Sequence, residues 1–141
     1  MNLLSFAVAF AVAFPHADAE PVACELIDLE SAEAVLGSGA INLSGEEVPT
    51  VCMYMSGDGS LMLQIQIFGV ELYDAVPISP RTPVEVGDRG RYNEDDEGTA
   101  IVQFAKGDYS VRVSITTRSG PPSSRIESLI DAARLAAERM P

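Results

Sequence analysis

The sequence predicts one α+β domain, in which a single antiparallel sheet of about four to five strands has a short N-terminal helix and a C-terminal helix packed on one face. Leucine or isoleucine recurs at every second position of residues 61–68, which is typical of a strand buried on one side. Residues 126–140 place their apolar side chains on one stripe of a helix. The chain of 141 residues has room for one ordinary domain, which we assign to residues 20–141.

The first 19 residues have the pattern of a secretory signal peptide. Residues 3–14 form an uncharged apolar run that is too short to cross a bilayer core, which needs about 20 helical residues. Pro15 ends the run, and residues 17–19 (ADA) have the small-x-small pattern that signal peptidase cleaves. We therefore predict a mature chain that begins at Glu20, has no transmembrane span, and is periplasmic or secreted. A buried helix of the domain is the alternative interpretation of the run.

The two cysteines, Cys24 and Cys52, are expected to pair, because oxidising compartments favour disulfides. A bridge between them closes a loop of about 29 residues, worth roughly 3.5 kcal/mol in the chain-entropy model. A redox pair normally has Cys-x-x-Cys spacing, which is absent here, so we interpret the bridge as structural. A lipid on Cys24 is the alternative, but Pro21 stands where a lipoprotein signal has an aliphatic residue.

The first half of the mature chain predicts a helix followed by a hairpin. Asp28 can cap a helix that ends at Gly37, and the apolar side chains between them recur at helical spacing. Residues 38–48 are expected to be loop. Residues 50–55 and 61–68 are expected to pair as a hairpin around the turn-forming sequence SGDGS.

The second half predicts an irregular stretch and then another hairpin. Residues 71–75 suit one helical turn, and three prolines favour an irregular conformation over residues 77–83. Residues 84–93 suggest a short extended segment. Residues 99–105 and 109–117 are expected to be strands joined tightly by the sequence KGD.

The C-terminal helix is expected to begin with a capping box, in which Ser124 and Glu127 bond to each other's backbone N–H groups. Charged side chains fall opposite the apolar stripe, and Arg134 can pair with Glu138 one turn later. Leu135 is the exception, because it falls among the charged side chains.

The charge of the chain excludes two classes of partner. Acidic residues number 21 and basic residues 9, so the formal net charge is −12. Such a surface repels phosphate backbones and anionic lipids, so we expect no nucleic acid or membrane-surface binding. The single histidine, His16, falls in the predicted signal peptide, which disfavours imidazole chemistry in the mature chain.

The acidic run of residues 94–97 (EDDE) raises the possibility of a calcium site, since carboxylate oxygens suit that ion. An EF-hand loop started at Asn93 fails at its twelfth position, which is the apolar Phe104. We interpret the run as a solvated hairpin tip. With no motif for a nucleophile or a nucleotide loop either, we predict no catalytic residues, no cofactor, no metal and no enzymatic activity.

One sheet face is a candidate binding surface. The alternation of the two long strands predicts that the face away from the helices carries polar and adaptable side chains. Methionine and phenylalanine there would supply apolar contacts, and an arginine would supply a polar anchor. The candidate residues are Met62, Gln64, Gln66, Phe68, Arg112 and Ser114. An ordinary wetted sheet face is the alternative interpretation.

Several motifs together resemble a family of small exported bacterial domains. The motifs are CELIxxxSAEAVLG from Cys24, CxY from Cys52, VGDRG from Val86, AKGDYSVRV from Ala105, and the alanine-rich C-terminal helix. Many members of this family are lipoproteins of unknown function, from which this chain departs at Pro21. The resemblance implies a disulfide between the two cysteines and a sheet-and-helix domain related to PsbP-like folds. It implies no catalytic residues.

We therefore predict an exported, non-enzymatic binding or accessory protein whose partner is an unknown envelope protein or a small apolar ligand. Two alternatives remain open from the sequence. One is a secreted inhibitor that presents residues 77–83 to a partner enzyme. The other is a metal-dependent hydrolase that uses the acidic run of residues 94–97.

Overall fold

The computed structural model describes residues 19–45, 48–75, 82–94, 98–118 and 125–141. Its helices are α1 (Ala23–Leu26), α2 (Leu29–Leu36), α3 (Leu72–Ala75) and α4 (Ile126–Arg139). Its strands are β1 (Ile41–Asn42), β2 (Val51–Met55), β3 (Leu61–Gly69), β4 (Thr82–Pro83), β5 (Arg89–Glu94), β6 (Thr99–Lys106) and β7 (Tyr109–Thr117). The domain is therefore α+β, as the sequence predicts.

All strands join one antiparallel sheet in the order β1-β2-β3-β7-β6-β5-β4. Both predicted hairpins are confirmed, as β2–β3 and β6–β7. The long strands β3 and β7 pair at the centre, from Leu61 opposite Thr117 to Gly69 opposite Tyr109. The last strands of the two hairpins thus form the central pair, and the first strands, β2 and β6, lie on its two sides.

The predicted strand number was too low, because the sheet described here has seven strands. The two edge strands, β1 and β4, have only two residues each, which is too short for an alternating pattern. β1 falls within residues 38–48, which were expected to be loop. It forms because Ile41 and Asn42 pair with the end of β2, and Leu43 N–H continues this edge by donating to Met53 O (2.8 Å).

The segment of residues 84–93 is extended only in its second half, where β5 begins at Arg89. Before β5 the chain turns sharply, and Gly87 adopts a left-handed φ of 61°. The segment then folds back over Gly90, where an added Cβ would lie 2.7 Å from Val84 O. Glycine at position 90 therefore permits the close approach of these two backbones.

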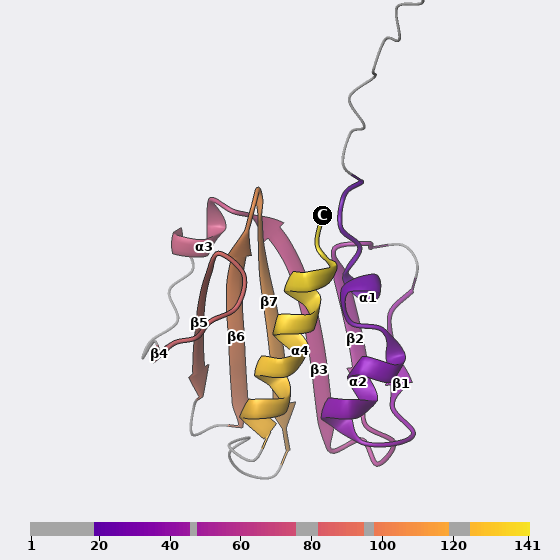
Figure 1. Ribbon diagram of the computed structural model, residues 1–141. Helices are drawn as coiled ribbons and strands as arrows, with labels where there is room; N and C mark the ends of the chain where they lie inside the picture. Colours follow the sequence, from indigo (N-terminus) through magenta and orange to yellow (C-terminus); the bar gives the residue numbers. More distant parts are fainter. Residues whose placement is uncertain (1–18, 46–47, 76–81, 95–97, 119–124) are drawn as a thin grey trace, which may run out of the picture.

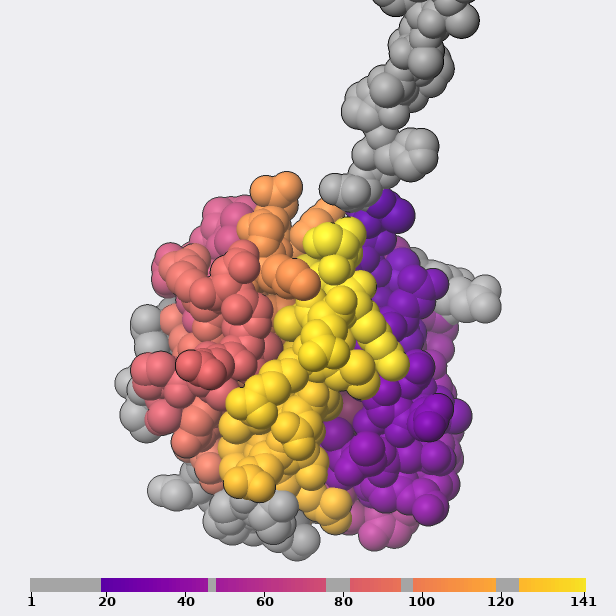
Figure 2. All heavy atoms as spheres, in the orientation of Figure 1, coloured from indigo at the N-terminus to yellow at the C-terminus, as the bar shows by residue number. Residues whose placement is uncertain are grey.

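One face of the sheet is covered by α1, α2 and α4 (Figure 1). Seen from that side, α4 and the N-terminal helices lie next to each other across the sheet (Figure 2). The side chains between the layers are almost all aliphatic or aromatic and form the core. The largest of them are Tyr54, Phe104, Ile27, Leu63, Ile65, Ile115 and Leu129.

The ends of the helices follow the sequence in one case and differ from it in the other. Asp28 caps α2 as predicted, since its Oδ1 accepts the Ser31 N–H (2.9 Å). The N-cap position of α4 is Arg125, one residue later than predicted, and its side chain makes no capping bond, while the capping box itself stays a prediction. Ser124 lies outside the described residues. The Arg125 guanidinium instead donates to Val35 O (3.0 Å), which ties α4 to α2.

The disulfide between Cys24 and Cys52 joins α1 to β2, with the two Cα atoms 5.1 Å apart. Beside it, the buried Tyr54 hydroxyl donates to Ile27 O (2.7 Å). Burial and the nearby Asp28 carboxylate raise the pKa of Tyr54. The first helices are therefore held to the sheet by a covalent bond and a buried hydrogen bond, in addition to apolar packing.

Leu135 has a structural explanation although it lies among charged side chains. It lines a small hollow between α4 and α2 together with Ala34 and Val35. Within the described residues, no helix is long and apolar enough to span a membrane. The predicted signal peptide (except Ala19) and most of the proline-rich segment 77–83 lie outside those residues.

Candidate functional site

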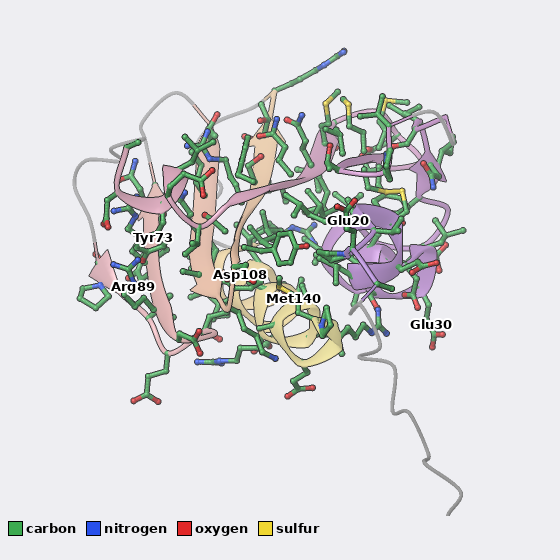
Figure 3. The ribbon with its side chains drawn as sticks, turned by 90° about the horizontal axis from the view of Figure 1, so that it is seen from above. Glu20, Glu30, Tyr73, Arg89, Asp108 and Met140 are labelled. Atoms are coloured by element: carbon green, nitrogen blue, oxygen red, sulfur yellow. A yellow bond between two sulfur atoms is a disulfide. The ribbon has the colours of Figure 1, made fainter. Side chains whose placement is uncertain are left out.

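We call the sheet face turned away from α1, α2 and α4 the open face. Side chains project from it on the far side of the sheet from α4 (Figure 3). Strand register arranges it in rows that run across the strands. One row is Val51, Gln66, Arg112, Gln103 and Arg91; the next is Met53, Gln64, Ser114, Ile101 and Asn93; a third is Ile41, Met55, Met62, Thr116 and Thr99.

The structure brings all six candidate residues together on the open face. Gln64 lies directly opposite Ser114, and Gln66 lies directly opposite Arg112. Met62 and Phe68 lie at opposite ends of the same strand. All six side chains are half-buried, whereas their neighbours along β3 and β7 on the covered face are buried. The alternation in the sequence was sufficient to place them.

The sequence did not reveal that α3 covers one end of the open face. The Arg91 guanidinium stacks on the Tyr73 ring at 4.3 Å from its centroid and donates to the Tyr73 carbonyl. It also donates to Gln103 Oε1 (2.8 Å), and Gln103 Nε2 donates to Ser110 Oγ (3.3 Å). Arg91, Gln103 and Ser110 are all buried. The polar letters at positions 91 and 103, inside otherwise strand-like runs, are the signal that could have indicated this cluster.

Arg112 differs from the other arginines that approach the sheet. Its Nε is buried and has no hydrogen-bond acceptor among the described residues. Arg89 and Arg139, by contrast, pair with Asp74 (3.3 Å) and Asp28 (3.4 Å). The other buried side-chain polar atom without a partner in the described part of the chain is Asn93 Oδ1, which is also on the open face.

The β1–β2 edge of the open face is apolar. Ile41 and Leu43 are 49% and 46% exposed, and Ile41 lies directly opposite Met55. A shallow groove of about 300 Å³ adjoins Met53 at this edge. Its lining residues are Ser44, Gly45, Val48, Val51 and Met53. The open face therefore has the Arg112 guanidinium at its centre and apolar side chains along its β1–β2 edge.

The one acid in the β2–β3 turn is engaged in local structure. Asp58 Oδ1 accepts hydrogen bonds from the hydroxyls of Ser56 and Ser60, both at 2.7 Å. These bonds, with that from the Ser60 N–H, lower the pKa of Asp58 to about 2. A carboxylate with so low a pKa is a poor proton acceptor near neutral pH.

Across the described ranges, no three His, Cys, Asp or Glu side chains gather into a metal-binding group. Of the acidic run, Glu94 ends β5, and residues 95–97 lie outside the described residues. The prediction that this run binds no metal therefore stays a prediction.

Comparisons of the chain with protein-family models, with curated proteins and with solved structures found no match. The resemblance to small exported bacterial domains with PsbP-like folds stays a prediction.

Proposed function

We propose that the chain is an exported, non-enzymatic binding protein that uses the centre of the open face to hold an anionic group of its partner. The partner is an envelope protein or a small ligand with an apolar part. Arg112 is the anchor, and Met62 and Phe68 supply adaptable apolar contacts.

The observation that carries this proposal is that the buried Nε of Arg112 has no hydrogen-bond acceptor in the described part of the chain. Buried polar groups are paired in the great majority of proteins, and leaving a donor unpaired costs about 1–3 kcal/mol. The chain has 21 acidic residues, so its own sequence has many carboxylates that could pair with this arginine. A guanidinium that has no carboxylate partner among the described residues is suited to bind a carboxylate from outside, in a two-pronged arrangement.

The residues around Arg112 support recognition and not catalysis. Gln66 and Ser114 lie next to it as half-buried neutral polar groups, which can position a ligand by hydrogen bonds. None of these side chains is a general base near neutral pH.

Site-specific photocrosslinking in the native envelope tests the proposal. A photoreactive residue at Ser114, two positions from Arg112, should capture a discrete species, and the added Arg112→Leu substitution should abolish it. The matched control is a photoreactive residue at Glu138, which is exposed on α4 and should capture nothing specific. Capture that is equal at both positions, or unaffected by Arg112→Leu, would contradict the proposal.

Native mass spectrometry of protein purified from the envelope tests the case in which the partner is a small ligand. A bound mass should be present in the parent and absent in Arg112→Leu. Circular dichroism should show that Arg112→Leu is folded, because the substitution removes an unpaired donor and leaves the core unchanged.

A further inference from the structure

Three of the five methionines of the chain lie next to each other on the open face. Met53 and Met55 belong to β2, and Met62 lies on β3 directly opposite Met55. Figure 3 shows sulfur atoms on the side of the sheet away from the helices, separate from the disulfide. Met140, in contrast, is buried in the core at the end of α4.

The hydrogen-bond pattern of the hairpin brings these side chains close together. The Ser56 N–H donates to Leu61 O (3.0 Å), so this pair is hydrogen-bonded. Antiparallel pairs alternate, so Met55 and Met62 form a non-hydrogen-bonded pair, in which Cα atoms lie about 4.5 Å apart and side chains are closer. Met53 is the diagonal neighbour of Met62 and lies on the same side of β2 as Met55. Three long unbranched side chains in this arrangement can bring their sulfur atoms to one point.

Apolar side chains flank the three thioethers on the edge of the sheet. All three side chains are half-buried, and Ile41 and Leu43 flank them on the edge strand. In the adjoining turn, Asp58 Oδ1 accepts hydrogen bonds from the Ser56 and Ser60 hydroxyls. The donor atoms that the three methionines themselves offer are soft and uncharged.

We propose that Met53, Met55 and Met62 form a three-thioether site for a soft monovalent cation, Cu(I) or its redox-stable analogue Ag(I). Thioether sulfur selects Cu(I), whereas Ca²⁺ and Mg²⁺ require oxygen ligands. Neutral ligands leave the charge of the ion uncompensated, and this costs less for a singly charged ion than for a doubly charged one. The site goes beyond the proposed partner binding, because it lies at the turn end of the open face and does not use Arg112.

Titration of the full chain with Ag⁺ in chloride-free buffer tests the site, after a thiol assay shows that the two cysteines are oxidised. The probe is the methionine methyl region of the NMR spectrum. The methyl signals of the three open-face methionines should shift and saturate at one equivalent of Ag⁺, and the Met140 signal should not move. Ca²⁺ should shift none of them.

Leucine substitutions separate the thioethers from the apolar surface, because leucine is close to methionine in volume. The triple substitution Met53→Leu, Met55→Leu and Met62→Leu should abolish saturable Ag⁺ binding, and each single substitution should weaken it by roughly tenfold or more. Met140→Leu should bind like the parent. Arg112→Leu, which should abolish the crosslink from Ser114, should bind Ag⁺ like the parent, so failure of this site and failure of partner binding are distinguishable. Parent protein without saturation at one equivalent, or a triple variant that binds as tightly as the parent, would overturn the site.

Discussion

The two faces of the sheet carry different side chains and are stabilised by different forces. The covered face is aliphatic and aromatic, and the helices exclude water from it. The uncovered part of the open face carries methionine, glutamine, serine and arginine, and these side chains are half-buried without a helix above them. Stability therefore depends on the first face, and recognition is available to the second.

The end of the open face under α3 is an intermediate case. Its side chains are polar but as deeply buried as the core, and hydrogen bonds replace apolar contacts there. Burial and polarity are therefore set separately on this face, since α3 buries Arg91 together with its acceptors, whereas the Nε of the half-buried Arg112 has no acceptor among the described residues. Four substitutions test how far the difference between the faces extends.

The largest expected effect comes from the covered face of β3. Leu63 is fully buried, so Leu63→Ala should lower the free energy of unfolding by about 3–5 kcal/mol through lost burial and a cavity. Met62→Ala is the matched control, because Met62 is adjacent, similar in size and on the open face. It should cost less than about 1 kcal/mol in urea denaturation. Equal losses would show that the open face is as tightly packed as the core.

The disulfide should have the next largest effect. Replacing Cys24 and Cys52 with serine should cost about 2–5 kcal/mol and lower the Tm by roughly 10 °C or more, because the unfolded chain loses a loop constraint. The far-ultraviolet circular dichroism at low temperature should stay close to that of the parent, since β3 to α4 lie outside the loop. A double variant that melts within about 2 °C of the parent would mean that the cysteines do not pair, and intact-mass measurement would then test lipid on Cys24.

The buried polar cluster under α3 should have a smaller effect. Gln103→Leu removes the side-chain amide acceptor of the Arg91 guanidinium and should cost about 1–3 kcal/mol. Gln64→Leu is the control on the uncovered part of the open face and should change stability by less than about 0.5 kcal/mol. A neutral Gln103→Leu would mean that Arg91 is satisfied by its contacts with Tyr73.

The smallest expected effect is at the cap of α2. Hydrogen bonds from the Ser31 hydroxyl and N–H, and then the Arg139 guanidinium, lower the pKa of Asp28. A lowered folded-state pKa stabilises the fold above the unfolded value of about 4, and the contribution is lost as pH falls through the folded-state pKa. Asp28→Ala should cost about 1 kcal/mol at neutral pH.

Asp28→Asn separates the cap from the charge, because asparagine caps a helix about as well as aspartate. The thermal stability of Asp28→Asn should be measured from pH 7 to pH 2. At pH 7 the variant should keep most of the parent's stability, and towards pH 2 it should lose less stability than the parent does. An acid response like that of the parent would assign the pH dependence to other carboxylates.

The sequence by itself determined the local structure. Alternation predicted both hairpins, and the six candidate residues lie on one face because side-chain direction in a strand repeats every two residues. Asp28 predicted the start of α2, and the cysteine count predicted the disulfide. The hairpins and the cap depend on residues that are near each other in the chain. The disulfide could be predicted because each cysteine has one possible partner.

The tertiary structure alone decided which segments lie next to each other. β1 and β4 are strands only because longer strands offer them a free edge, and their two residues contain no pattern of their own. Sequence reasoning could not distinguish Arg91 from Arg112, because both lie in extended segments of the same sheet. α3 places a ring and a carbonyl over Arg91, and nothing described pairs with the Nε of Arg112. Such contacts join residues far apart in the chain, so their partners are set by how the sheet assembles and not by local pattern.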